Sequence, residues 1–429
     1  MKLLLTADIH IGRRPGGLPA GIDGRQYSAG ALWAAIVDKA IDEKVDAVLL
    51  GGDVVDRDNR MCEAFGPLER GIRKLGALGI QTVAVSGNHD FDVLPALTRV
   101  LPDECFHLVG QKGKWERFTV EKEGKPVLLV DGWSYPAKHV RFNPVPGYDL
   151  PAPGDGVPLV GLLHTDVDKA DHPYAPVSSD ELRAKPPRFW LLGHNHGPDL
   201  KEHGVAPILC PGAPQAVTRK DFGAHGVWIG ELAGGAGLDV TFHPLARVQY
   251  ESLDVDLGGA GSTDDVRVKA IEAMREALHA AVEQNQWLEY VLCRMRLTGR
   301  CKVLGELDST ARQLKEDLQL SEGDLTGSIE KITVSATPDY DLAELARETE
   351  VSAVGTLAGL LISLENGTLS TEYPDLVRAA GSRIEAVGKS GTYSSARLPE
   401  EAPDVEGHIR EQGMRLLDAL IAQRAGRSP

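Results

Sequence analysis

The first 250 residues alternate between short runs of apolar, β-prone residues and longer segments whose apolar residues recur at helical spacing. The predicted helices span residues 31–43 and 67–78. The predicted strands are Lys2–Thr6, Ala47–Leu50, Thr82–Val85, Val127–Val130, Leu159–Leu163 and Phe189–Leu192. Continuous apolar strands separated by helices indicate a sheet that is covered on both faces. The pattern therefore predicts a layered α/β domain over residues 1–250.

The pattern changes after Tyr250. Strands at 252–257, 288–298 and 329–335, with helices at 264–284 and 309–318, predict a smaller α+β domain over residues 251–340. From Leu342 the chain is mostly helical, so residues 341–429 are predicted to form a helical C-terminal region. Residues 141–158 and 233–237 are rich in proline or glycine and are predicted to be a loop and a turn.

Composition narrows the class of protein. An apolar content of 42% with 25% charged residues is neither that of a disordered chain nor that of a membrane-spanning one. The apolar run Leu3–Leu5 is too short for a signal peptide or a membrane anchor, so we expect a cytoplasmic protein with no membrane partner. Five widely spaced cysteines without a CxxC pair indicate reduced thiols.

The formal net charge of −16 argues against a protein that binds nucleic acid through bulk charge. Most of that charge belongs to the second part of the chain. Residues 1–250 carry −4, whereas residues 251–429 carry −12.

Five polar clusters follow or end predicted strands. They contain Asp8 and His10; Asp53 and Asp56; Asn88, His89 and Asp90; His164; and His194 and His196. Open α/β sheets place ligand sites at the carboxyl ends of their strands, so we expect these side chains to converge on one site. A single DxH or GxH motif is typical of ordinary surface turns, but five clusters behind five strands favour a functional site.

Carboxylate, imidazole and amide groups together are suited to a two-metal site. This mixed donor set favours Mn, Fe, Co or Zn over Mg, which prefers oxygen and water ligands. Two adjacent ions need a bridging ligand, and Asp53, which follows two glycines, is the candidate bridge.

The same residues resemble the signature of the calcineurin-like metallophosphoesterases, which reads DxH, GDxxD, GNH[DE], H and GHxH. The stretches Leu162–Ser179, Phe189–His196 and Cys210–Gln215 look more specifically like the SbcD-type nuclease subunit of SbcCD DNA repair complexes. This resemblance implies a sandwich of mixed sheets flanked by helices, with a capping domain after Tyr250. It covers residues 1 to about 335 well and the C-terminal region poorly.

The resemblance also implies roles for individual residues. One metal would be held by Asp8, His10, Asp53 and His196, and the other by Asp53, Asn88, His164 and His194. His89 would be the catalytic histidine that protonates the leaving oxygen or steadies the phosphate. Asp56 would orient a ligand histidine; Asp90 has either that role or a turn-forming one. The implied reaction is in-line attack on phosphorus by a metal-bound hydroxide.

Local positive charge would allow an acidic chain to hold DNA. Two metal ions add about four positive charges to a segment at −4. Arginines near the ligands, and on the outward face of the strand around residue 294, are candidate contacts to the DNA backbone; the alternative is a solvated polar face. The candidates are Arg13, Arg14, Arg57, Arg60, Arg294 and Arg296.

We therefore expect a two-metal-dependent DNA phosphodiesterase, with manganese the most suitable metal, that works with an SbcC-like coiled-coil ATPase. Whether it is an exonuclease or an endonuclease, and whether it forms a homodimer, is left open. The C-terminal region, with an apolar stripe at Leu416, Leu417, Leu420 and Ile421, is the candidate ATPase-docking segment; packing within the protein is the alternative.

The alternative function is a metallophosphoesterase for a phosphoprotein, a cyclic nucleotide or a nucleotide-sugar lipid. A structural subunit is a third hypothesis, which the full ligand set disfavours.

Overall fold

The computed structural model describes residues 1–56, 61–101, 104–154, 156–169, 172–202, 206–232, 238–348, 352–388 and 404–424. The predicted turn at 233–237 lies outside the described residues. The chain divides into two compact units. One contains Met1–Leu253, Glu272–Met295 and Lys315–Lys331, and the other contains Asp254–Ile271, Arg296–Leu314 and Ile332–Pro429. None of the described helices combines the length and the apolar character needed to cross a membrane.

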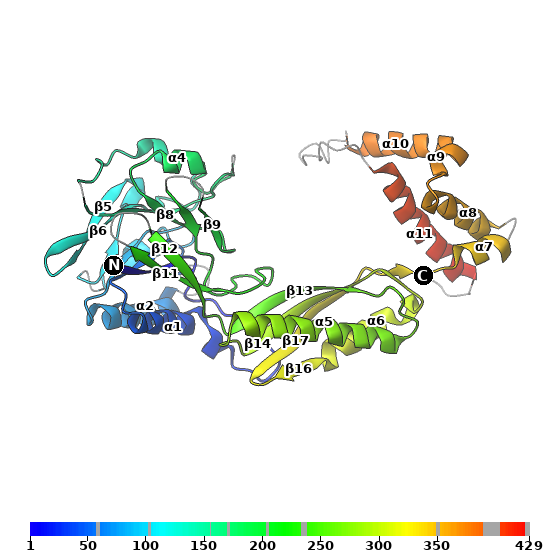
Figure 1. The fold of residues 1–429 in the computed structure, drawn as a ribbon, viewed down its shortest axis with the longest axis horizontal. Coiled ribbons are helices and arrows are strands. Elements are labelled where there is room, and N and C mark those ends of the chain that lie inside the picture. The colour runs from blue at the N-terminus through cyan, green and yellow to red at the C-terminus, as the bar shows by residue number, and fades with distance from the viewer. Residues whose placement is uncertain are drawn as a thin grey trace. The chain divides into compact units, whose positions relative to one another are not determined.

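Two mixed six-stranded sheets organise the first unit (Figure 1). The first sheet has the order β12-β11-β1-β2-β3-β4, with β1 to β4 parallel. Its strands are β12 Leu238–Pro244, β11 Gly226–Leu232, β1 Lys2–Thr6, β2 Ala47–Leu50, β3 Gln81–Ala84 and β4 Phe106–Leu108. The second sheet has the order β5-β6-β7-β8-β10-β9, with antiparallel strands at both edges. Its strands are β5 Glu116–Lys122, β6 Lys125–Trp133, β7 Leu159–His164, β8 Phe189–Gly193, β10 Ile208–Cys210 and β9 Asp199–Lys201.

Alternation along β1 explains how the first sheet is buried on both sides. Leu3 and Leu5 belong to the apolar core shared by the two sheets, together with residues of β6, β7 and β8. Leu4 belongs to the core on the other face, which is covered by α1 (Ala29–Asp42) and α2 (Met61–Gly76). Successive strand side chains point to opposite faces, so an apolar run such as β1 fills two cores at once.

The outer face of the second sheet carries a third core. Trp190 and Leu192 of β8 lie there with Leu182 of the short helix α4 (Ser179–Arg183) and with aromatic residues of the loops. A further short helix, α3 (Val93–Leu97), follows β3. The predicted fold class, mixed sheets flanked by helices, is therefore confirmed. The helix predicted to begin at residue 67 begins at Met61 instead, so that Pro67 lies inside α2 and removes one backbone donor from it.

The chain from Val248 to Pro338 contains a four-stranded sheet of order β13-β14-β17-β16 and the helices α5 and α6. Its elements are β13 Val248–Asp256, α5 Thr263–Gln284, β14 Tyr290–Thr298, α6 Leu304–Asp317, β16 Gln319–Glu322 and β17 Leu325–Val334, with β15 Arg300–Cys301 pairing with β18 Thr337–Pro338. The hydroxyl of Ser262 accepts a hydrogen bond from the backbone of Asp265, which makes Ser262 the N-cap of α5. The domain boundaries predicted at residues 250 and 340 stay a prediction.

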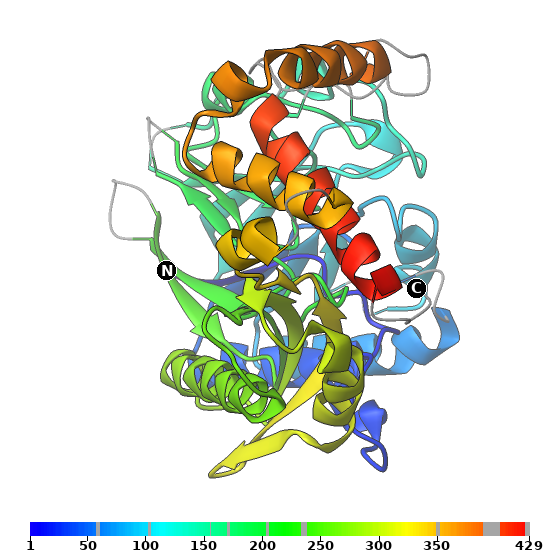
Figure 2. The ribbon, with the colours of Figure 1, turned by 90° about the vertical axis from the view of Figure 1, so that its right-hand side faces the viewer.

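The described part of the C-terminal region is helical, as predicted. Its helices are α7 Leu342–Glu348, α8 Ala353–Glu365, α9 Leu369–Glu372, α10 Pro374–Gly388 and α11 Val405–Arg424. Figure 2 shows α8 and α11 crossing one another. The predicted docking stripe is used in this packing: Leu417 is fully buried, and Leu420 and Ile421 pack against the same apolar cluster. Of the stripe, Leu416 remains exposed, and docking of an ATPase on this region stays a proposal.

Candidate metal centre

The two sheets bring their carboxyl ends together at one point. Gly51, after β2, and Gly193, at the end of β8, approach so closely that a Cβ on Gly193 would lie 2.1 Å from the carbonyl oxygen of Gly51. Only glycine permits this approach of two backbones. The loops after β1, β2 and β3 therefore meet the end of β7 and the loop after β8.

Several predicted ligands in these loops have a left-handed backbone conformation. Among the described residues, nine non-glycine residues have a positive φ, and four of them are predicted ligands: Asp8 at 54°, His10 at 50°, Asp53 at 49° and His194 at 93°. Such conformations are uncommon for residues with a Cβ and persist where the surrounding structure holds them for function.

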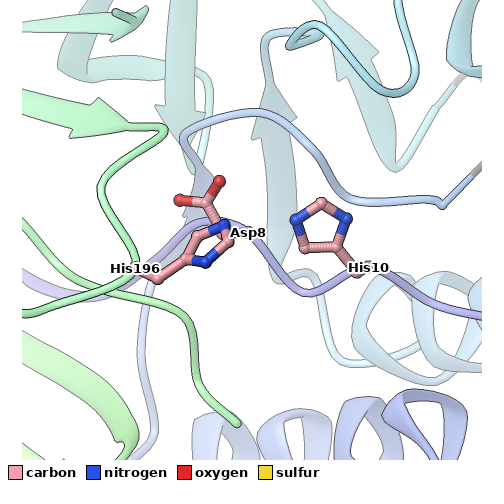
Figure 3. Close-up of side chains that lie close together, drawn as sticks. All are labelled: Asp8, His10 and His196. Atoms are coloured by element: carbon pink, nitrogen blue, oxygen red, sulfur yellow. The ribbon is translucent and has the colours of Figure 1, made fainter. Parts of the chain in front are cut away.

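The first group of predicted ligands consists of Asp8, His10 and His196, whose donor atoms all lie within 4.8 Å of one another (Figure 3). The His10 side chain is buried, and neither of its ring nitrogens has a hydrogen-bond partner among the residues that the structure describes. Burial lowers the pKa of His10 to about 3, so the ring is neutral and keeps a free lone pair. Burial raises the pKa of the Asp8 carboxyl.

The second group contains Asp8, Asp53 and His164, with the same limit of 4.8 Å between donor atoms. The Nδ1–H of His164 donates to the Gly51 carbonyl at 3.0 Å, which turns Nε2 toward Asp53 Oδ2 at 3.4 Å. The Oδ1 atom of Asn88 lies 3.1 Å from both His164 Nε2 and His194 Nδ1. Asp53 Oδ2 is also 3.9 Å from His10 Nε2. Asp8 belongs to both groups, and Asp53 lies within reach of donor atoms of both; a bridging role for Asp53 stays a prediction.

His89 lies at the rim of this cluster. Its backbone N–H donates to Asp53 Oδ1 at 2.8 Å, and its ring stands 4.8 Å from the ring of His10 in an edge-to-face arrangement. The side chain is 28% exposed, whereas that of His10 is 1% exposed. Asp56, 3.9 Å from the His89 ring, raises the pKa of that imidazole.

The two predicted supporting carboxylates differ in what they contact. Asp56 lies 3.6 Å from His10 Nδ1 and accepts a hydrogen bond from Arg13 Nε. Asp90 accepts hydrogen bonds from the backbone of Val54 and Gly87, each at 2.7 Å. Asp90 therefore joins the loops after β2 and β3, which favours its turn-forming alternative.

Two further carboxylates support ligand histidines and were not predicted from the sequence. Asp166 Oδ2 lies 3.3 Å from His194 Nε2, and Asp221 Oδ2 lies 3.2 Å from His196 Nδ1. Such carboxylates fix the orientation and tautomer of the ligand ring. Asp166 directly follows the His164 motif, but Asp221 lies in a loop without any motif to mark it.

The candidate DNA contacts lie in different surroundings. Arg13 is held by Asp56 and the Val217 carbonyl, while Arg14 lies 3.5 Å from Glu63. Arg296 pairs with Asp254 at the surface, and Arg294 pairs with Glu330. Arg57 and Arg60 lie outside the described residues.

The donor set fits a pair of divalent metal ions. Buried polar atoms are ordinarily hydrogen-bonded, so the two unpartnered nitrogens of His10 between buried carboxylates call for another partner. Ligand histidines in metal sites characteristically donate their second N–H to a carbonyl or carboxylate, as His164, His194 and His196 are placed to do.

Comparison with known proteins agrees with this geometry. Residues 1–198 match the family model of the calcineurin-like phosphoesterases, and residues 250–337 match that of the middle domain of metallophosphoesterase YhaO. The uncharacterized metallophosphoesterase YhaO of Bacillus subtilis is 28% identical over 263 residues, which are 60% of this chain and 63% of that protein. The chain thus spans less than two thirds of the length of that relative.

A second relative by sequence and a solved structure are also similar to this chain. The DNA double-strand break repair protein Mre11 of Aeropyrum pernix is 24% identical over 300 residues, covering 67% of this chain and 71% of that protein. The crystal structure of calcineurin-like phosphoesterase YfkN from Bacillus subtilis covers 66% of this chain and 98% of its own, with 14% identity and a TM-score of 0.36.

Proposed function

We propose that this chain, whose residues 1–198 match the family model of the calcineurin-like phosphoesterases, is a metal-dependent phosphodiesterase that cleaves DNA. The observation that carries the proposal is the convergence of the buried donors around Asp53, with His89 beside them and more exposed. The similarity to a protein named for DNA double-strand break repair supports DNA as the substrate. An SbcD-like role beside a coiled-coil ATPase is the biological setting we propose.

The proposed metal ligands are the residues whose donor atoms meet around Asp53. They are Asp8, His10, Asp53, Asn88, His164, His194 and His196. Imidazole and carboxylate donors together favour manganese, with iron, cobalt or zinc also compatible and magnesium less so. Bound at this site, such ions would offset the charge of the phosphodiester and activate water for hydrolysis.

His89 is the proposed general acid. Its ring is held near the ligands by the hydrogen bond from its own backbone to Asp53 Oδ1, yet it is partly exposed and free to face a substrate. Asp56 lies beside the ring on its buried side and favours the imidazolium, which is the form that can donate a proton. His89 would protonate the oxygen of the leaving nucleotide or hold a phosphate oxygen.

We propose that DNA contact is local. Residues 1–250 carry a net charge of −4, so bulk charge does not attract DNA to this part of the chain. Arg14 and Arg296 have half-exposed side chains within reach of solvent. Replacing Arg296 with alanine should remove about one phosphate contact. The slope of the logarithm of DNA affinity against the logarithm of salt concentration should then become shallower by about 1. The ATPase partner and a homodimer are proposed sources of further DNA affinity.

The test is cleavage of DNA by the full chain with Mn²⁺, Mg²⁺ or a chelator. Linear and circular DNA, single- and double-stranded, separates exonuclease from endonuclease activity, and bis(p-nitrophenyl) phosphate reports hydrolysis of a small phosphodiester. Replacing His89 with alanine should reduce DNA cleavage by about 10²- to 10⁴-fold. His279→Ala is the matched control, since His279 is an exposed histidine that pairs with Glu322.

Hydrolysis of the small ester without DNA cleavage would contradict the proposal. If the small ester is hydrolysed while DNA stays intact, even with the ATPase added, the substrate is another phosphate ester and the DNA proposal is wrong. A phosphoprotein, a cyclic nucleotide and a nucleotide-sugar lipid are then the substrates to try.

A further inference from the structure

The 217–221 loop is fixed to His196 by the Asp221 carboxylate. Asp221 Oδ2 lies 3.2 Å from His196 Nδ1 and accepts the backbone N–H groups of Val217, at 3.0 Å, and Thr218, at 2.9 Å. Asp221 Oδ1 accepts the hydroxyl of Thr218 at 2.9 Å. With its oxygens bound to its own loop, the carboxylate moves with that loop. A displacement of the loop therefore displaces the partner of a proposed metal ligand.

The other side of this loop is held by two strands of the four-stranded sheet. Arg294 of β14 donates from Nη1 to the backbone carbonyl of Arg219 at 3.2 Å, and its Nε lies 3.7 Å from Glu330 Oε2. Glu330 of β17 also forms an ion pair with the Arg219 side chain. The hydrogen bond from Gly223 N–H to the Tyr250 carbonyl, at 3.0 Å, fixes the chain just after the loop.

The Glu330 carboxylate fixes the positions of the two arginines at this loop. Its side chain is only 6% exposed, and its Oε2 has no hydrogen-bond partner within the described part of the chain. A buried carboxylate needs paired cations, and the guanidinium groups of Arg219 and Arg294 lie beside it. The charge of Glu330 thus holds both arginines in place.

The same loop is connected to the other side of the metal centre. The Val217 carbonyl accepts a hydrogen bond from Arg13 Nη1 at 3.3 Å, and Arg13 Nε donates to Asp56. Asp56 in turn lies 3.6 Å from His10 Nδ1. The loop therefore contacts one ligand of the first group, His196, and is linked through Arg13 to Asp56, which lies beside His10 without a hydrogen bond to it.

We propose that Arg294 and Glu330 are positioning residues for the metal centre, acting on His196 through the 217–221 loop and Asp221. The proposal rests on the proposed function only in taking His196 as a metal ligand, and it assigns Arg294 a role other than DNA contact. Neither residue belongs to the segment that matches the phosphoesterase family model; both belong to the 250–337 segment. The second segment would thereby set the metal affinity of the first.

Arg296 provides the matched comparison. It lies on the same strand two residues further on, is a second candidate DNA contact, and pairs with Asp254, with both side chains more than half exposed. A role in DNA binding alone predicts that replacing either arginine leaves metal affinity unchanged. A positioning role predicts a loss of metal affinity for Arg294 only.

The experiment measures Mn²⁺ binding to the full chain by isothermal titration calorimetry and by electron paramagnetic resonance of the bound ions. We expect Arg294→Ala to weaken binding of one ion by about 10-fold, the lower end of the range usual for the outer partner of a ligand histidine, because Arg294 acts through that partner, Asp221. Arg296→Ala should bind Mn²⁺ as the unaltered chain does. Wild-type affinity in Arg294→Ala, or an equal loss in Arg296→Ala, would overturn the proposal.

A double-mutant cycle tests whether Arg294 acts through Asp221. If it does, Arg294→Ala combined with Asp221→Asn should lose little more Mn²⁺ affinity than Asp221→Asn alone, whereas losses that multiply would contradict this route. Glu330→Gln, which keeps the shape of the side chain, is the second variant if Arg294→Ala melts before the measurement, and it should also weaken Mn²⁺ binding. Because Mn²⁺ binding needs no DNA, the proposal can survive even if the chain cleaves no DNA.

Discussion

Nε2 of His194 lies 3.3 Å from Oδ2 of Asp166, a carboxylate that is only 2% exposed. The other ring nitrogen of His194 lies 3.1 Å from the Asn88 side-chain oxygen, inside the metal centre. A histidine has one donor and one acceptor nitrogen when neutral, so an Nε2–H donated to Asp166 leaves the lone pair of Nδ1 for a metal. Asp166 thus selects the tautomer that the site requires.

Replacing Asp166 with asparagine should weaken metal binding by about 10- to 100-fold, because the amide no longer fixes the tautomer and orientation of the His194 ring. The measurement is Mn²⁺ titration by calorimetry. Asp168→Asn is the control, since Asp168 bonds to Lys201 and to the backbone of Ser179 instead. Unchanged affinity in Asp166→Asn would show that His194 does not depend on this carboxylate.

The predicted ligands could be found from the sequence because each follows or ends a strand with a strong local pattern. The strand Lys2–Thr6 was predicted with its observed bounds, and Asp8 and His10 come directly after it. Asp221 could not be found this way: it lies 25 residues beyond His196, in a loop, and only tertiary packing brings the two together. The pairing of Arg294 with Glu330 depends on strand register in the same manner.

The strands missed by the sequence analysis are short, polar or interrupted by glycine. β9, for example, has only three residues, Asp-Leu-Lys, and gains its conformation from pairing with β10. The hairpin of β11 and β12 was missed although β11 is largely buried, because Gly226 and Gly230 interrupt its apolar pattern. A Cβ on Gly226 would lie 2.0 Å from the His243 carbonyl oxygen, so the glycine is needed for pairing with β12. Tertiary context decides such strands.

Gly87 should be intolerant of any side chain. A Cβ at this position would lie 2.3 Å from Asp53 Oδ1 and 2.7 Å from His164 Cε1, so Gly87→Ala must displace both proposed ligands. A displacement of about 1 Å in such a site costs on the order of 10² in rate. We expect hydrolysis of bis(p-nitrophenyl) phosphate to fall by at least that factor. Gly147→Ala, where a Cβ would meet no atom of the described residues within 4 Å, should retain full activity.

Metal removal should lower the melting temperature. Asp8 and Asp53 are buried beside the unpartnered nitrogens of His10, and an ion would satisfy these groups in the folded state alone. At a free metal concentration of 100 times Kd the stabilisation is about 2.7 kcal/mol. Differential scanning calorimetry with Mn²⁺ against chelator measures the shift, which we expect to shrink in His10→Ala. Identical melting curves with and without metal would contradict the assignment.

Adjacent leucines of α11 should differ sharply in their effect on stability. Leu417 is fully buried in a cluster with Ala358, Leu361 and Met414, so Leu417→Ala should cost about 2–5 kcal/mol by leaving a cavity between α8 and α11. Leu416 is 53% exposed, and Leu416→Ala should change stability by less than about 0.5 kcal/mol. Hydrogen exchange of the α8 and α11 amides in the full chain locates the effect.

The two leucine variants also separate packing from partner binding. If an ATPase docks on this helix, Leu416→Ala weakens co-purification of the ATPase while leaving hydrogen exchange unchanged. Equal exchange in both variants would mean that α11 does not pack as the structure has it.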